Sequence, residues 1–535
     1  MIKWHIVLCV VIVMVALTAC ILWASFMPHS RTPPSFSHLD MPMPTAHSIE
    51  AATSGMNVAD FSVNDSFASH LPLILIDTIG ENIMIHETWD NDKGHMVPIQ
   101  GIEPNVLGTL YIFSNGTASN HLTDAPTWQT PISIRRRGNS SMSYEKAQYK
   151  INLQTETGQE NRLPLLGMDD EDEWVLSGSM IDKSLMRNYL AYTTALQIMP
   201  YAPEVRYCEV FLLEDGKPIY QGVYLLTESI KQGPGRVEIN TTDSVGSTRS
   251  YMLRRDRLNP DGIMLDTYAT REQLSEGFLE LLYPKNEEAT PDVIRVIEKE
   301  ISNIEQVIYS DDPSVFLTYP NYINVDSFVD YFLINEFFTN YDAGFHSTYY
   351  YKDLRGKLCI GPVWDFDGTI DNYVEQELYV ENMPFYHAPW FDRLVNHTEF
   401  VEKLVARYHV LRKSVLAEDS IMSTIDQTAR YLGPAEKRDW LRWNHVYTGY
   451  HSFTLLAYTN DEGHLIHRLT RNYDQELIKI RYLLGEHGKV MKTNLKNLIR
   501  ETGMVSNASD VQKNTILVIG FILLFFSVAV IARRE

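Results

Sequence analysis

The stretch from Asn340 to Asn372 constrains the fold more than any other part of this 535-residue sequence. Apolar and polar residues alternate over 347–352 and again over 358–363, and the polar segment Arg355-Gly356-Lys357 lies between them. This pattern predicts two short strands joined by a hairpin. The hairpin would bring the chain before its first strand close to the chain after its second strand.

Acidic residues stand at both ends of this hairpin, with Asp342 before it and Asp365 and Asp367 after it. Carboxylates at close range repel one another unless a cation or a proton lies between them. Oxygen ligands favour Mg²⁺ or Mn²⁺ over zinc. The stretch therefore predicts a divalent-cation site. The alternative is that these residues only cap turns, where Asp is common.

Composition and charge limit the class of protein. The chain is 44% hydrophobic and 21% charged, which is typical of a globular protein long enough for more than one core. Its formal charge of -22 argues against nucleic acid as a partner, because phosphate binding needs a basic face. Only Cys208 and Cys359 lie outside the apolar N-terminus, so this is not a disulfide scaffold.

Both ends of the chain are apolar enough to cross a membrane. Ile6 to Pro28 and Asn514 to Ala532 are uncharged runs of 23 and 19 residues, and basic residues flank their outer ends. The positive-inside rule then predicts two cytoplasmic termini and an extracytoplasmic middle. The alternative at the N-terminus is a lipoprotein signal, because Leu17-Thr18-Ala19-Cys20 fits a lipidation box with Cys20 as the modified residue.

The sequence predicts five regions. Residues 1–28 form a signal anchor, and residues 29–70 form a flexible linker rich in Pro, Ser, His and Met. The folded domain spans residues 71–485, a basic stem spans 486–513, and a transmembrane helix spans 514–532.

Within the folded domain the hydrophobic pattern predicts an α+β fold with a helical C-terminal part. Expected strands cover residues 71–78, 106–113, 132–137, 146–153, 205–213, 219–227 and 250–253. Expected helices cover residues 182–198, 291–308, 325–339, 400–417, 420–431 and 473–484, with Asp182 as the N-cap of the first.

A second candidate site lies near the start of the folded domain. One expected strand ends in Arg137-Gly138-Asn139-Ser140-Ser141, and the next strand carries Lys146 and Lys150. A glycine-containing polar loop offers backbone N–H groups and hydroxyls to phosphate, and a lysine supplies charge. The alternative is an ordinary turn. The pattern does not decide which lysine would contact the phosphates.

Several motifs in series resemble the CotH family of atypical protein kinases from bacterial spore coats. The resemblance covers roughly residues 71–485. The matching segments are Arg137 to Ser141, Lys146-x-x-Tyr149-Lys150, Asp182 with Arg187-Asn188, Gly222-Val223-Tyr224 with Glu228, Asn340-x-Asp342, and Trp364-Asp365-x-Asp367.

This resemblance implies a kinase-like, two-lobed domain that binds ATP with Mg²⁺ or Mn²⁺ and phosphorylates Ser or Thr of spore-coat or cell-envelope proteins. Asp342 would be the catalytic carboxylate, and Asp365 and Asp367 would bind metal. The loop residues Arg137, Asn139, Ser140 and Ser141 would bind the nucleotide. Lys146 or Lys150 would contact its phosphates, and Glu228 would pair with that lysine or lie near the nucleotide.

Two other functions are compatible with parts of the sequence. Kinases place Asn five residues after the catalytic Asp, whereas Ser347 stands there in this chain, which favours a pseudokinase or an envelope structural protein. The segment Asp365-Phe366-Asp367-Gly368-Thr369 also matches the first motif of haloacid-dehalogenase-like phosphatases. No glycine after Thr369 is followed by Asp, so the later metal motif of that family is missing.

Overall fold

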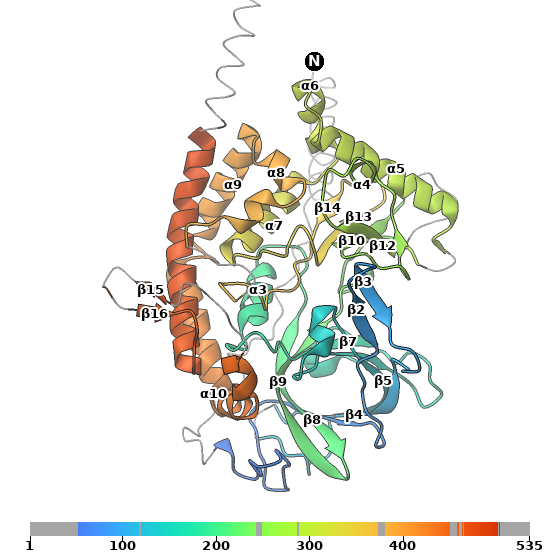
Figure 1. Cartoon of the computed structure of the whole chain (residues 1–535), viewed down its shortest axis with the longest axis vertical. Coiled ribbons are helices and arrows are strands. Elements are labelled where there is room, and N and C mark those ends of the chain that lie inside the picture. The colour runs from blue at the N-terminus through green and yellow to red at the C-terminus, as the bar shows by residue number, and fades with distance from the viewer. Residues whose placement is uncertain are drawn as a thin grey trace, which may run out of the picture.

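The computed structural model describes residues 52–116, 119–241, 249–285, 288–372, 380–449 and, within 457–502, all but 460–462, 464 and 501. The described part is a mixed α+β structure with a helical C-terminal part, as the sequence predicted (Figure 1). The two apolar terminal segments lie outside the described residues. Of the helices that are described, none is both long and apolar enough to cross a bilayer.

A closed seven-stranded barrel forms the N-terminal half, at the lower right of Figure 1. Its strands follow the order β1-β4-β5-β6-β7-β9-β8, and all neighbours are antiparallel except β1 and β8, which are parallel. The strands are β1 (Leu73–Asp77), β4 (Val106–Phe113), β5 (Trp128–Arg136), β6 (Tyr149–Leu153), β7 (Glu173–Ser177), β8 (Val205–Glu214) and β9 (Lys217–Glu228).

The barrel has an apolar interior because every second residue of its strands points inward. Ile132 and Ile134 of β5, Ile151 of β6 and Trp174 of β7 belong to this core, and all are almost fully buried. The residues between them face outward. A small hairpin, β2 (Glu87–Asp90) and β3 (His95–Pro98), lies beside the barrel.

A five-stranded antiparallel sheet lies between the barrel and the helices, with the order β11-β12-β10-β13-β14 (Figure 1). Its strands are β10 (Tyr251–Asp256), β11 (Ile263–Met264), β12 (Phe278–Tyr283), β13 (Thr348–Lys352) and β14 (Cys359–Ile360). The last two form the hairpin expected after Asp342, and Tyr350 pairs with Ile360 across it.

The C-terminal half is helical and packs around one large apolar core. Its longer helices are α5 (Pro291–Ile308), α7 (Val325–Phe337), α9 (Thr398–Leu411), α10 (Glu418–Gly449) and a helix over residues 473–500. The shorter elements are α4 (Tyr268–Arg271), α6 (Pro313–Phe316), α8 (Phe391–Leu394), the 3-10 turns η2 (Ser140–Ser143), η3 (Leu165–Gly167), η5 (Tyr319–Asn321) and η6 (Pro384–His387), and the hairpin β15 (Ala457–Thr459) and β16 (Leu465–His467). Helix caps agree with the sequence: Thr290 and Asn324 accept hydrogen bonds from the first turns of α5 and α7.

Several boundaries differ from the prediction. The strand expected over 146–153 begins at Tyr149, so Lys146 precedes it, and the helices expected over 400–417 and 420–431 are Thr398–Leu411 and Glu418–Gly449. Three further differences have a visible structural cause or consequence. The helix expected over 182–198 is the shorter α3 (Arg187–Ala195), because Asp182 forms a turn with Ser184 before that helix begins. Residues 52–70 were expected in the flexible linker, yet they pack on the barrel, where the Phe67 ring lies 5.4 Å from the Phe211 ring. Residues 486–500, expected in the stem, continue the helix that begins at residue 473.

Candidate functional site

A cleft of about 1540 Å³ separates the barrel from the second sheet and the loops next to that sheet. The outer face of the barrel forms one wall. The other wall comes from β10, β13, the chain around Asp342, which we call the first acidic segment, and the chain around Asp365 and Asp367, which we call the second acidic segment. We call it the central cleft. Its lining includes Arg137, Gly138, Asn139, Ser140, Ser141, Lys150 and Glu173 on the barrel side, and Asp342, Ser347, Trp364, Asp365 and Asp367 on the opposite side.

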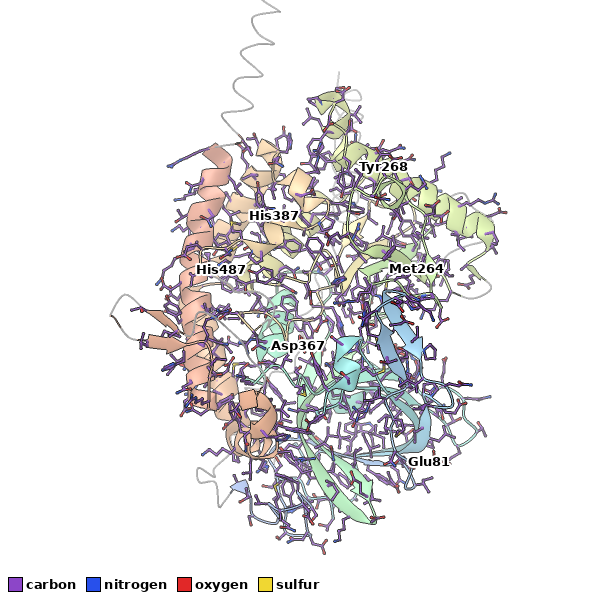
Figure 2. The ribbon with its side chains drawn as sticks, viewed as in Figure 1. Glu81, Met264, Tyr268, Asp367, His387 and His487 are labelled. Atoms are coloured by element: carbon purple, nitrogen blue, oxygen red, sulfur yellow. The ribbon has the colours of Figure 1, made fainter. Side chains whose placement is uncertain are left out.

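The three predicted carboxylates all line this cleft, and Figure 2 shows Asp367 near the middle of the molecule. Only 8% of Asp367 is exposed. Burial raises the pKa of Asp367 well above its ordinary value, and the negative charges of Asp365, Asp182 and Asp342 raise it further. These carboxyl groups are therefore close enough to disfavour one another's charge, which a bound cation would relieve.

The β13–β14 hairpin explains how Asp342 comes near Asp365. Asn340, just before Asp342, donates from its side chain to the carbonyl of Asp365 over 3.3 Å, and its own side-chain oxygen accepts from the N–H of Ala343. The loop then turns at Gly344, where φ is +89° and an added Cβ would overlap Ala388. The loop that carries Asp342 is thereby joined directly to the backbone of the second acidic segment.

Helix α3 holds the second acidic segment from its other side. The Tyr192 hydroxyl accepts the Asp365 N–H over 3.1 Å, and the Asn188 side chain accepts the Phe366 N–H over 2.7 Å. Asp365 adopts the left-handed region with φ +67°, a conformation that costs a non-glycine residue energy and persists only where its surroundings hold it.

Arg187 of α3 continues this support beyond Asp367. Its guanidinium donates to the carbonyls of Thr369 and Ile370 over 2.8 and 3.2 Å. The buried charge is balanced by Asp182 at 2.7 Å and by Glu476 at 2.6 Å. The motif of Asp182 with Arg187-Asn188 therefore positions the acidic segment and does not line the cleft itself.

The loop expected to hold phosphate lies on the barrel side of the cleft. Gly138 has φ +108°, and an added Cβ would overlap the Ser141 hydroxyl, so glycine is needed there. The Arg137 guanidinium lies 5.5 Å from the centre of the Trp364 ring. This cation–π contact joins the loop to the residue next to Asp365.

The two lysines have different surroundings. Lys150 of β6 lines the cleft and pairs with Glu173 of β7 at 2.7 Å, with about a quarter of each side chain exposed. Lys146 is fully buried and pairs with Asp439 of α10 at 2.6 Å. Because Lys146 does not line the cleft, its predicted contact with phosphate and its catalytic role have no support in the geometry.

Glu228 also lies away from the cleft lining. It is buried, pairs with Arg236 at 2.5 Å and accepts the Glu204 N–H at 3.0 Å. The predicted pairing of Glu228 with Lys146 or Lys150 is therefore wrong. The acidic partner of Lys150 is Glu173 instead. Glu173 alternates with the buried Trp174 along β7 and so faces outward, and this alternation was the signal in the sequence that could have identified it.

The oxygen ligands at the second acidic segment fit a divalent cation that also binds the phosphates of a substrate. Asp365 and Asp367 supply carboxylate oxygens, and the Ser347 hydroxyl donates to Asp365 over 3.3 Å. Across the described residues, no group of three or more His, Cys, Asp or Glu side chains is arranged to hold a metal ion. Mg²⁺ usually takes one or two carboxylates together with water and substrate phosphates, so an open pair of carboxylates suits it.

Sequence reasoning missed Tyr192 as well as Glu173. Tyr192 follows Asn188 by four residues on α3, so both side chains lie on one helix face, and this spacing was the available signal. Glu476, which balances Arg187, had no such signal because it lies 289 residues further along the chain.

Comparison with known protein families gives a match. The sequence model of one family, described as CotH kinase protein, matches residues 134–481, which is more than half of the chain and includes every predicted site residue. No curated protein matches the chain. The phosphate-type loop, the acidic segments and the α3 residues that support them all lie within the matched range, and the chain belongs to the CotH kinase family.

Proposed function

We propose that this protein is an atypical protein kinase that transfers the γ-phosphate of ATP to a protein hydroxyl with Mg²⁺ or Mn²⁺. The observation that carries the proposal is the pair of facing walls: the Arg137–Ser141 loop and Lys150 lie on one side of the central cleft, and Asp342, Asp365 and Asp367 lie on the other. Family membership supports it at the level of an atypical kinase.

Each wall has a separate role in this proposal. Lys150, Arg137 and the N–H and hydroxyl groups of the loop bind the phosphates of ATP. Asp365 and Asp367 hold the divalent cation, which neutralises phosphate charge when it is bound. Asp342 orients the attacking hydroxyl and accepts its proton. In phosphoryl transfer, positioning and charge neutralisation supply most of the rate.

The proposal extends to location and substrate. The two apolar terminal segments anchor the chain in the membrane with the catalytic part outside the cytoplasm, and the acceptors are envelope or spore-coat proteins. Reporter fusions at residues 60 and 500 would both give an external signal. A cytoplasmic signal from either fusion would contradict two membrane spans, and a mature N-terminus at Cys20 would establish lipidation instead.

Two substitutions test the roles of the carboxylates. Asp365→Asn is expected to lower both phosphotransfer and Mg²⁺-dependent ATP binding, because it removes a metal ligand. Asp342→Asn is expected to leave ATP binding nearly unchanged and to lower turnover on the order of 10²-fold or more. Transfer of γ-labelled phosphate and calorimetric binding of ATP with Mg²⁺ measure the two effects separately.

The other outcomes identify the competing functions. Wild-type protein that binds no ATP with Mg²⁺ would be a pseudokinase or an envelope structural protein, an alternative that Ser347 still motivates. An aspartyl-phosphate formed from a phosphomonoester would indicate a phosphatase. Wild-type turnover in both Asp variants would contradict the kinase assignment.

A further inference from the structure

A buried histidine on the helix of residues 473–500 contacts α7, which precedes Asp342, and Val380, which follows Asp367 in the chain. Only 2% of His487 is exposed, and Figure 2 shows it on that helix. Its Nδ1 lies 2.9 Å from the carbonyl oxygen of Val380, and its Nε2 lies 2.9 Å from the carbonyl oxygen of Glu336. Glu336 belongs to α7, which leads to Asp342, and Val380 belongs to the chain that follows Asp367.

These two contacts indicate the protonation state of the ring. A carbonyl oxygen only accepts hydrogen bonds, and a neutral imidazole carries a single N–H. Both contacts can therefore be hydrogen bonds only when both ring nitrogens carry protons. The Glu336 carbonyl also accepts the Thr339 N–H at 3.0 Å, so it keeps a donor when the ring is neutral. A neutral ring would nevertheless lose one of its two hydrogen bonds and place a nitrogen lone pair against an acceptor oxygen.

The surroundings supply a reason for the positive charge. The Glu336 carboxylate, which is fully buried, has one oxygen 3.4 Å from His487 Nε2, and its other oxygen accepts the Phe385 N–H at 3.0 Å. The Glu336 carbonyl is also in the last turn of α7, where the helix dipole favours a cation. Burial lowers the pKa of His487, but the hydrogen bond and ion pair with Glu336 outweigh it and raise this pKa above its ordinary value. Burial also raises the pKa of Glu336, and the contact with His487 opposes that rise, so each group favours the charged form of the other.

Other charged or titratable groups surround this pair. Tyr408 of α9 donates from its hydroxyl to the Gly488 carbonyl, and the Arg412 guanidinium lies against Gly488. His387 of η6 and Tyr341 of the Asp342 loop interact electrostatically with Glu336. On the helix of His487 itself, Glu486 and Lys489 pair with each other. Glu336 is the group among these that contacts the His487 ring.

The end of α7 is joined rigidly to both acidic segments. The Ile370 N–H donates to the Thr339 hydroxyl at 3.0 Å and to the Phe338 carbonyl at 3.2 Å. The Asn340 N–H donates to the Asn335 carbonyl at 2.8 Å. A shift at the last turn of α7 would therefore move the chain around Asp342 and the chain after Asp367 together.

We propose that His487 is a positioning residue that, in its protonated form, fixes the end of α7 against the Val380 segment and so makes phosphotransfer depend on pH. This inference rests on the proposed kinase function for its effect on rate. When the pH rises above the range in which His487 keeps its proton, the ring loses one of its two hydrogen bonds to carbonyl oxygens and Glu336 loses its charged partner. Turnover then falls through a group that does not line the central cleft.

The experiment uses the full chain in four forms: wild type, His487→Gln, Glu336→Gln and, as a matched control, His409→Gln. His409 is exposed on α9, so its substitution tests whether loss of a histidine alone changes turnover or stability. Turnover and the unfolding temperature are measured from about pH 6 to about pH 10, the range that spans a raised histidine pKa. Histidine ring NMR signals are followed in parallel, and the His487→Gln spectrum identifies the His487 signal.

The expected results separate positioning from simple packing. Wild type and His409→Gln should lose turnover as the pH rises through the pKa of His487, and His487→Gln should lack this loss. Glu336→Gln should move the midpoint of this loss of turnover to lower pH by about one unit, the shift expected when a charged partner becomes neutral. A packing role alone would change the size of the activity but not this midpoint.

Stability gives a readout that does not need kinase activity. Because the folded pKa of His487 is raised, its contribution to folding is complete below the unfolded pKa of about 6.5 and is lost as the pH rises through the folded pKa. The difference in unfolding temperature between wild type and His487→Gln should shrink accordingly. A constant difference, or a ring signal that titrates at or below the ordinary pKa, would overturn the inference. Absence of phosphotransfer at every pH, with the stability and NMR results as expected, would overturn the proposed function alone.

Discussion

Lys146 and Lys150 lie four residues apart and have opposite expected responses to substitution. Lys150→Met should weaken ATP binding by about 1–3 kcal/mol, the range for a hydrogen bond to a charged group, because Lys150 lines the central cleft. It should change stability little, since the partly exposed pair with Glu173 contributes about 1 kcal/mol or less. Calorimetric titration with ATP and thermal unfolding measure the two effects.

Lys146→Met is the matched control for Lys150→Met. It leaves Asp439 as a buried charge without its lysine, so the expected loss of stability is about 3–5 kcal/mol. The Val223 N–H and the Tyr447 hydroxyl still donate to Asp439, which would reduce that loss. If Lys146→Met folds normally but fails to bind ATP, the assignment of Lys150 to the phosphates is wrong.

The raised pKa of Asp367 predicts how the cleft responds to pH and metal. A carboxyl group whose folded pKa is raised binds more protons when folded, so without metal the stability should fall as the pH rises above the ordinary value of 3.8. Mg²⁺ must displace that proton, so its affinity should rise with pH over the same range. Thermal unfolding with and without Mg²⁺ measures both. Asp367→Asn should abolish the pH dependence of stability without metal. A pH dependence that persists in this variant must come from another group.

The residue assignments show what sequence spacing can and cannot identify. Asp342, Asp365 and Asp367 were predicted to converge because a hairpin is a local structure, and Asp342 and Asp365 do contribute to the raised pKa of Asp367. Lys146 was a candidate on the same kind of spacing. Its partner Asp439 lies 293 residues away, and no pattern near Lys146 reveals a buried ion pair of that kind.

At the scale of elements, helix α3 fixes the second acidic segment through side-chain hydrogen bonds. Tyr192→Phe removes the hydroxyl that accepts the Asp365 N–H while it keeps the ring stacked on Trp364. Phosphotransfer should fall roughly tenfold, which corresponds to about 1.4 kcal/mol of barrier. Steady-state phosphotransfer at saturating ATP measures this change.

Tyr207→Phe is the matched control for that prediction. It also removes one buried tyrosine hydroxyl bond, to the Leu185 carbonyl at 2.8 Å, but it has no contact with Asp365. Both variants should lose similar stability, about 1 kcal/mol each. Equal loss of activity in the two would mean that Tyr192 contributes only to packing.

Two elements with strong periodicity were predicted to the residue, whereas several elements that depend on tertiary contacts were not. The helix over 291–308 and the strand over 106–113 match α5 and β4 because their apolar patterns and the α5 cap are local. The helix expected from Asp182 begins at Arg187 instead, because the Asp182 side chain binds Ser184 and Arg187. Ordinary capping rules do not distinguish an Asp that caps a helix directly from an Asp that forms a turn before the helix.

At the scale of the whole molecule, closure of the barrel was not visible in the sequence. The individual strands follow from alternation, but closure needs the parallel pairing of β1 with β8, which lies more than 130 residues further along the chain. Residues 52–70 then cover the outside of this part, where Arg438 of α10 donates to the Ala52 carbonyl and to the Ser69 hydroxyl. The prolines of the predicted linker all precede residue 52, and residues 52–70 show no periodicity that would reveal these contacts.

The limits of the folded unit provide the last prediction. The family match begins at residue 134 and so leaves out β1 and β4, without which the barrel cannot close. The predicted domain of residues 71–485 also omits Phe67 at one end and Met491 and Leu495 at the other, all at most 1% exposed. Each large apolar side chain that is fully buried contributes about 1.5–3 kcal/mol. A chain of residues 71–485 should therefore unfold at a clearly lower temperature than residues 52–502, because such losses are large against a total stability of about 5–15 kcal/mol.

Chains of residues 71–502 and 52–485 assign that loss to one end or the other. The first should keep His487 and its pH dependence with a weakened barrel, and the second should keep the barrel and lose that dependence, because His487 is removed. Differential scanning calorimetry of the four chains at two pH values measures both effects. If residues 71–485 unfold at the same temperature as residues 52–502, the packed ends contribute nothing to stability. In that case the coupling proposed between the helix of residues 473–500 and the acidic segments would have no structural basis.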